Sequence, residues 1–189
     1  KLRGENLLLI AGRQGIPEEI VLKHEPVSNY TAPLMWELRG PDRAMVASGT
    51  IGQAETGTIG FTAEKDGVYV IAASAGSCAY AVISSNVPLA IFAGAKASFI
   101  GVAPKLYFSV PKGTKSFAIK VDSSGQETVR VNVFDPQDKQ IATGQTTPQN
   151  GKIEVSVQCA DEDGGVFSLD TARADIGVVE DYALTLDPK

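Results

Sequence analysis

The chain of 189 residues contains one histidine, two cysteines and one tryptophan. A serine or cysteine nucleophile needs a titratable base beside it, and His24 is the sole imidazole in the chain. Its place at the end of an expected strand, followed by Glu25-Pro26, favours a surface histidine without a catalytic role. The sequence also lacks a Gly-x-Ser-x-Gly nucleophile elbow. We therefore expect a protein that is not an enzyme.

The same scarcity limits the metals that the chain can hold. Transition-metal sites usually take four nitrogen or sulfur ligands, which one histidine and two separated cysteines cannot supply. Calcium prefers oxygen ligands, and Asp161, Glu162 and Asp163 form a candidate calcium site in a loop before Gly164-Gly165. The alternative is a solvated acidic turn that binds no metal. Two weaker candidate pairs are Asp42 with Asp66 and Asp135 with Asp138. No other cofactor is expected.

Basic residues are neither in excess nor clustered. The chain has 17 Lys and Arg against 22 Asp and Glu, for a net charge of −5. Binding to nucleic acid or to an anionic membrane surface relies on clustered Lys and Arg. We therefore expect no nucleic acid and no membrane among the partners.

Long hydrophobic runs are also missing. The most apolar run covers residues 68–83, is broken by Ser74, Gly76 and Ser77, and is shorter than the ~20 residues of a membrane helix. Two short strands joined by a small-residue turn explain it better. The printed sequence contains no signal-peptide pattern and begins abruptly at Lys1, and we expect an excised part of a longer exported protein, extracellular, periplasmic or at the cell surface.

What the sequence does contain is a repeat. Residues 40–49 match residues 135–144 at one offset, which places Pro41 on Pro136 and Gly49 on Gly144, and weaker matches flank this segment. A repeat of this length indicates a duplicated domain, because solenoid units run only ~20–50 residues. We predict two domains, residues 1–86 and 87–189.

The cysteines do not follow the repeat. Cys78 and Cys159 fall at non-equivalent positions of the two copies, so a duplicated structural disulfide is excluded. Two buried free thiols, which behave as small hydrophobic residues, and a bridge between the copies remain as alternatives.

The hydrophobic period is close to two. Val129, Val131 and Val133 alternate with polar residues, as expected for strands with one buried face. Glycine and proline fall between such runs at spacings of about 8–12 residues, which is typical of all-β sandwiches. We predict an all-β chain of two tandem antiparallel β-sandwich modules of the jelly-roll type. The expected strands are 6–10, 19–24, 33–39, 43–48, 58–63, 67–73 and 79–84 in the first copy, and 88–93, 97–102, 105–110, 116–121, 127–134, 138–143, 151–158, 165–170 and 178–186 in the second.

Three segments carry a resemblance to known proteins. The strand and turn of residues 105–117 and the Asp-Pro turn of residues 131–138 resemble β-sandwich modules of large exported bacterial proteins. The Asp66-Gly67-Val68-Tyr69 segment is similar to the pre-peptidase C-terminal type of jelly-roll module. Such modules accompany secreted hydrolases and are usually non-catalytic. The resemblance implies a β-sandwich accessory role and assigns no binding residue.

Carbohydrate is the small partner that the aromatic residues favour. An exposed ring can stack on the apolar face of a sugar, and Tyr30 and Trp36 are the candidate ligand-binding residues. The alternatives are an ordinary loop position for Tyr30 and a core position for Trp36, which lies in the middle of an expected strand.

We therefore expect a non-catalytic accessory or interaction module pair of a larger exported protein, with carbohydrate or other domains of the parent chain as partners. The alternative function is a structural spacer or adhesion segment without a small-molecule ligand.

Overall fold

The computed structural model describes residues 1–159 and 164–188, and every regular element in them is a β-strand. The strands pair antiparallel, which confirms the predicted all-β sandwich architecture. No helix long and apolar enough to cross a bilayer occurs in these two stretches.

The chain forms two compact units, residues 1–92 and residues 93–189, referred to below as unit 1 and unit 2. Unit 1 extends to residue 92 rather than to residue 86, where the sequence placed the boundary. The reason is a short strand, β7 (Leu89–Ile91), which pairs with the first strand of unit 1.

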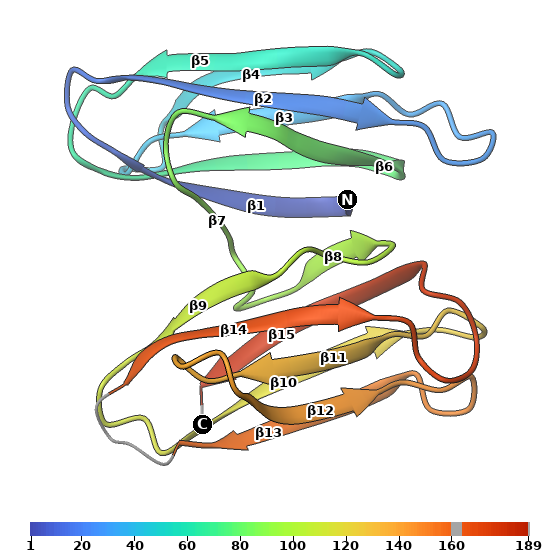
Figure 1. Ribbon diagram of the computed structural model, residues 1–189. Coiled ribbons are helices and arrows are strands. Elements are labelled where there is room, and N and C mark those ends of the chain that lie inside the picture. Colours follow the sequence, from blue (N-terminus) through green and yellow to red (C-terminus); the bar gives the residue numbers. More distant parts are fainter. Residues whose placement is uncertain (160–163, 189) are drawn as a thin grey trace. The chain divides into compact units, whose positions relative to one another are not determined.

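Unit 2 is a sandwich of two four-stranded sheets (Figure 1). One sheet has the strand order β13-β10-β15-β8 and the other has the order β12-β11-β14-β9. This order is the jelly-roll arrangement, in which the chain passes repeatedly between the layers. The strands are β8 (Ala97–Ile100), β9 (Leu106–Val110), β10 (Ser116–Ser123), β11 (Arg130–Phe134), β12 (Gln140–Gln145), β13 (Lys152–Gln158), β14 (Gly165–Ala172) and β15 (Asp181–Pro188).

Unit 1 has the same arrangement with fewer, longer strands. The first part of β6 pairs with β3, and its last part pairs with β2, so one continuous strand serves both layers. β6 therefore corresponds to β14 and β15 together, and β1 corresponds to β8 and β9 in the same way. The strands are β1 (Leu2–Gly12), β2 (Pro17–Glu25), β3 (Leu34–Arg39), β4 (Met45–Ile51), β5 (Thr56–Thr62), β6 (Gly67–Ser85) and β7.

Two glycines allow these long strands to change layer. Gly4 in β1 and Gly76 in β6 have φ of 64° and 57°, values that other residues adopt at a cost. Gly4 lies in a register shift between Arg3 and Glu5, as expected for a β-bulge that bends a strand. The apolar run that the sequence divided into two strands is thus one strand with a left-handed glycine inside it.

The turn after β3 repeats after β11, as the internal duplication predicts. Arg43 and Asp138 occupy the same turn position with φ of 67° and 63°. Gly67 and Gly165 have φ of 149° and 151°, and a Cβ on either would clash with the ring of Pro41 or Pro136, respectively. The two copies therefore share local backbone geometry as well as strand order.

The core of each unit is formed by the inward faces of its strands. In unit 2, Phe108, Phe117 and Phe167 form a cluster in which Phe117 lies edge-on to both neighbours, with ring centroids 5.4 Å apart. Each buried phenylalanine contributes about 1.5–3 kcal/mol through removal of apolar surface from water. This packing holds the two layers together and so fixes the outward faces.

Candidate functional site

The structure does not bring the two predicted sugar-binding residues into one site. Tyr30 lies in the loop between β2 and β3, and its side chain is 46% exposed. Trp36 lies on β3 in phase with buried Leu34 and Leu38, so its partly buried ring faces the core side. The ring covers Gly49, where a Cβ would lie 2.7 Å from it. Among the described residues, Tyr30 does not line the groove beside Trp36.

The predicted calcium ligands Asp161, Glu162 and Asp163 lie outside the described residues, so calcium binding stays a prediction. Within the described part of the chain, no group of three His, Cys, Asp or Glu side chains is placed to hold a metal ion. The weaker candidates have other partners. Asp42 pairs with Lys65, Asp66 accepts from the amide of Gln14, and Asp138 pairs with Lys105. Asp135 accepts two backbone amides of its own turn.

His24 is fully buried, and the expectation of a surface histidine is wrong. Its Nε2 donates to the carbonyl of Ala32 at 2.8 Å, and its Nδ1 accepts from the amide of Ala54 at 3.2 Å. This pattern requires a neutral imidazole, because a protonated ring has no acceptor nitrogen. His24 therefore joins the loop before β3 to the turn before β5, which is a structural role.

Both cysteines are free thiols. Cys78 is buried, and its Sγ lies 3.3 Å from the carbonyl oxygen of Tyr30, to which it donates. Cys159 is partly exposed, and desolvation raises the pKa of its thiol. A raised pKa is the opposite of the lowered pKa that makes a cysteine thiolate reactive, so Cys159 gives no sign of redox or nucleophilic chemistry.

A set of polar side chains gathers on the outward face of the β12-β11-β14-β9 sheet in unit 2. We call this surface the polar face. Its central residues are Arg130 and Asn132 from β11, Thr143 and Gln145 from β12, Asp170 from β14, and Asp175 from the loop after β14.

The alternation of β11 explains why these side chains point outward. Val131 and Val133 are fully buried, so Arg130 and Asn132 must project to the opposite face. The antiparallel register then places Gln145 opposite Arg130 and places Thr143 and Asp170 on either side of Asn132.

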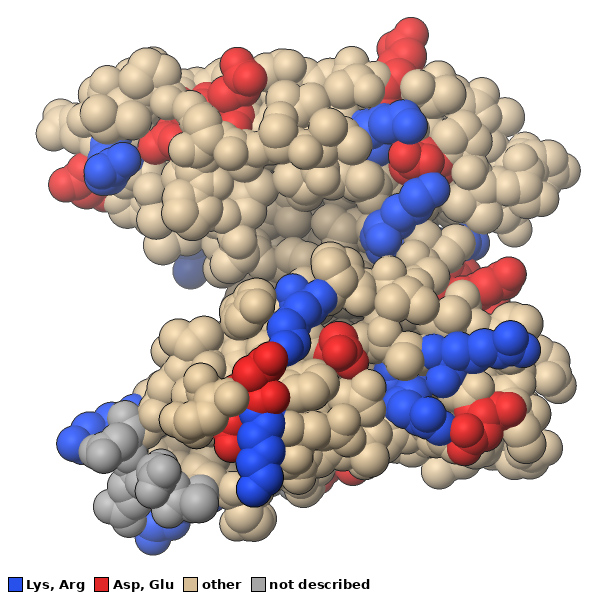
Figure 2. Space-filling model, viewed as in Figure 1, with Lys and Arg blue, Asp and Glu red and all other residues tan. Residues whose placement is uncertain are grey.

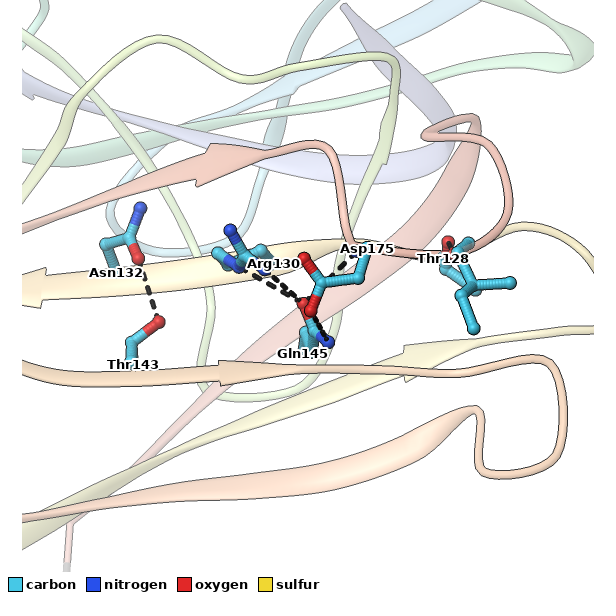
Figure 3. Close-up of polar contacts among 7 residues, drawn as sticks. Thr128, Arg130, Asn132, Thr143, Gln145 and Asp175 are labelled. Atoms are coloured by element: carbon cyan, nitrogen blue, oxygen red, sulfur yellow. Dashed lines mark hydrogen bonds and ion pairs between the residues drawn. The ribbon is translucent and has the colours of Figure 1, made fainter.

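Arg130, Gln145 and Asp175 form a closed polar triangle (Figure 3). The guanidinium Nη2 donates to Gln145 Oε1 and to Asp175 Oδ1, each at 2.6 Å. Gln145 Nε2 donates to Asp175 Oδ2 at 2.7 Å. These hydrogen bonds, first that from Gln145 and then that from Arg130, lower the pKa of Asp175. The Asp175 carboxylate is therefore charged at neutral pH.

A second chain of hydrogen bonds runs across three strands beside the triangle. Thr143 Oγ1 donates to Asn132 Oδ1 at 2.8 Å, and Asn132 Nδ2 donates to Asp170 Oδ1 at 2.9 Å. Both ends of the Asn132 amide are thereby oriented. An oriented amide presents its remaining N–H in a fixed direction, which lowers the entropy cost of binding a ligand.

Aromatic and basic side chains border the polar face at β9. Tyr107 is 70% exposed and pairs across the sheet with Ser168, which lies two residues from Asp170 on β14. Lys105 pairs with Asp138, and its Nζ lies 4.4 Å from the centre of the Phe134 ring. Phe134 is thus covered by a lysine, whereas the ring of Tyr107 is open to solvent.

The polar face is hollowed by a shallow groove of about 490 Å³. Figure 2 shows basic and acidic side chains interleaved on the visible side of unit 2 rather than separated into patches of one sign. The groove offers the N–H donors of Arg130, Asn132 and Gln145 together with the hydroxyl of Thr143, which suits a ligand rich in hydroxyl groups. Its lining consists of Arg130, Asn132, Gln140, Thr143, Gly144, Gln145 and Ala172.

The sequence contained part of the signal for this site. The alternation that placed Val131 and Val133 inward also placed Arg130 and Asn132 outward, and Tyr107 alternates with partly buried Leu106 and Phe108. Asp175 could not be found in this way, because it lies in a loop 45 positions from Arg130.

No known protein-family model matches the sequence, and no curated protein matches it.

Proposed function

We propose that the chain is a non-catalytic pair of accessory modules of a larger exported protein, and that unit 2 binds carbohydrate on its polar face. The observation that carries the proposal is the hydrogen-bonded network of Arg130, Gln145 and Asp175 with its neighbour Asn132. Arg130, Asn132 and Gln145 line a groove, and hydrogen bonds within the unit already orient their side chains.

The chemistry of the network favours a saccharide over an apolar ligand. Each sugar hydroxyl can donate and accept a hydrogen bond, and the polar face offers both functions close together. Planar groups such as guanidinium, amide and carboxylate can each engage two neighbouring hydroxyls. Tyr107 offers an open ring against which the apolar face of a sugar can stack, as aromatic side chains combine a large apolar area with a polar tip.

The open shape of the groove favours an extended chain. A shallow surface buries little of a small ligand, whereas a polymer can contact several points along a sheet. Alternate residues on β11 are about 6.8 Å apart, roughly the span of one sugar ring. Arg130 and Asn132, which both line the groove, thus provide successive contact points for successive sugar units.

The second candidate function is a structural spacer or adhesion segment without a small-molecule ligand. It is supported by the burial of several aromatic rings, among them Tyr69, Tyr80 and Tyr182. In that case the polar network would serve to keep the outward face of the sheet soluble.

A glycan array probed with the full chain distinguishes the two functions. We expect the wild-type chain to bind at least one class of oligosaccharide. The substitution Asn132→Ala removes the centre of one hydrogen-bonded chain and should weaken binding by about tenfold or more, since hydrogen bonds to charged groups are worth ~1.5–3 kcal/mol. The matched control is Glu37→Ala, at the corresponding position of unit 1, which should leave binding unchanged. Absence of binding across a broad array would remove the carbohydrate proposal and leave the spacer.

A further inference from the structure

The cations of the polar face are already neutralised by carboxylates of the same unit. Arg130 lies 2.6 Å from Asp175, and Lys105 forms an ion pair with Asp138. Both pairs are fixed by additional contacts, to Gln145 in the first case and to the ring of Phe134 in the second.

The carboxylates extend beyond these two pairs. Asp170 accepts from the uncharged amide of Asn132, so its negative charge is solvated rather than cancelled by a direct ion pair in the described structure. Two further cations, Lys139 and Arg173, lie next to the ends of β12 and β14. Two further carboxylates, Asp135 and Asp170, equal them in number and opposite charge. The surface as a whole carries no excess of positive charge.

We infer that the ligand of the polar face is a neutral saccharide chain and that uronate, sulfated or sialylated glycans are excluded. This inference deepens the proposed function and rests on it. A carboxylate or sulfate group placed on Arg130 would have to displace Asp175 from two hydrogen bonds or lie beside its negative charge. A sugar hydroxyl carries no charge, so it can bond the outer N–H groups of Arg130 while the triangle stays closed.

The geometry of Arg130 supports this reading. Its Nε and Nη2 face Gln145 and Asp175, at 3.1 Å for Nε and at 2.6 Å for both contacts of Nη2. The Nη1 group has two further N–H donors, and no described residue is assigned as their acceptor. The Nη1 group of Arg130 therefore offers two N–H donors, and Asp175 on the other side of the guanidinium balances its positive charge.

The test compares two sets of probes on the wild-type chain and on Asp175→Asn. One set consists of neutral oligosaccharides of glucose, mannose and xylose, and the other of oligomers of glucuronic and galacturonic acid. We expect the wild-type chain to bind at least one neutral probe, at least tenfold more tightly than any uronate probe, with weak dependence on salt. In Asp175→Asn the charge of Arg130 is uncovered at nearly constant shape, so uronate binding should rise at least tenfold and fall again with added salt.

The matched control is Asp42→Asn, which uncovers Lys65 in unit 1 and should change neither set. Thermal unfolding of each variant confirms that it is folded. If the wild-type chain prefers uronates, or if Asp175→Asn leaves the preference unchanged, the inference on charge is wrong while carbohydrate binding stands. If folded wild-type protein and folded Asp175→Asn bind no probe of either set, the proposed function itself is overturned.

Discussion

The two units share a strand arrangement but differ on the same outward sheet face. Trp36 and Val131 each pair with a glycine on the neighbouring strand, which aligns the hairpin β3–β4 with β11–β12. In this alignment Met35 of unit 1 stands where unit 2 has Arg130, and Ala72 stands where unit 2 has Asp170. The remaining correspondences are Glu37 with Asn132, Ser48 with Thr143 and Thr50 with Gln145.

Both units have a groove at this place, of about 550 Å³ in unit 1 and about 490 Å³ in unit 2. In unit 1 it is lined in part by Met35 and by Glu5 and Glu37, and Glu37 pairs with Arg39 along its own strand. The closed triangle is missing because the loop that supplies Asp175 has no counterpart. β6 runs without interruption where unit 2 has the connection between β14 and β15. The groove thus comes from the shared fold, whereas its chemistry comes from the outward residues and from one loop.

The largest expected effect is on the free energy of unfolding and comes from substitutions in the core of each unit, which leave its outward face unchanged. Phe117→Ala in unit 2 should lower the free energy of unfolding by about 3–5 kcal/mol, because it leaves a cavity between Phe108 and Phe167. The corresponding position in unit 1 is Glu18, which is buried and whose Oε1 has no partner among the described residues. Glu18→Met should therefore stabilise unit 1, by about 1–3 kcal/mol.

Hydrogen exchange resolved by segment measures both effects in the full chain. Exchange should speed up in β10, β13 and β15 for Phe117→Ala and should slow in β2 and β5 for Glu18→Met. Tyr107→Ala is the control, since its exposed ring contributes little to stability. A Glu18→Met chain that unfolds more easily than the wild type would contradict the comparison of cores.

A smaller effect is expected for the buried polar residues at the ends of β2 and β10, whose removal should lower the free energy of unfolding by different amounts. His24 and Ser123 correspond, since they pair with Tyr80 and Tyr182, respectively. His24→Ala removes two hydrogen bonds and leaves the carbonyl of Ala32 and the amide of Ala54 unpaired, which should cost about 2–4 kcal/mol. Ser123→Ala removes the bond to Thr146 and should cost about 1 kcal/mol.

Urea unfolding, followed by tryptophan fluorescence for unit 1 and by hydrogen exchange for unit 2, measures this difference. Trp36 is the sole tryptophan, so its emission reports on unit 1. Equal costs for the two substitutions would show that His24 is no more important than its counterpart.

The smallest expected effect concerns the pH dependence of the polar face. The hydrogen bonds of Gln145 and Arg130 lower the pKa of Asp175, so the folded state favours the charged carboxylate. A group with a lowered pKa contributes above its unfolded value and loses this contribution as the pH falls through its folded value. Glycan binding should thus be constant from about pH 8 to about pH 5 and decline below about pH 4. Titration of wild-type protein and of Asp175→Asn checks this, because the variant should lack the decline if it binds at all.

The duplication was visible in the sequence, but part of its alignment slips by two residues. The segment of residues 19–23 resembles residues 116–120, which sets Leu22 on Ile119. The strand pairing sets Leu22 on Val121 instead, because His24 and Ser123 stand opposite equivalent tyrosines. A shift of two keeps every side chain on the same face of its strand, so hydrophobic alternation cannot detect it.

The burial of His24 was also present in the pattern. Ile20, Leu22 and His24 follow the period of two, and all three are fully buried. The phase of the strand therefore predicts burial for His24 more reliably than its place at the strand end, which favours exposure. The His24 ring can be buried without a large desolvation cost because two backbone groups hydrogen-bond both of its nitrogens.

By itself the sequence determined the β-strands, the face of each strand that turns inward, and the presence of two copies. These properties follow from local alternation and from self-similarity, which a single chain displays directly. The tertiary structure alone decided which strands are neighbours, that β1 and β6 serve both layers, and that Asp175 meets Arg130. Alternation assigns a residue to a face but not to a partner, and partners on a sheet are set by long-range pairing and by the loops that connect the strands.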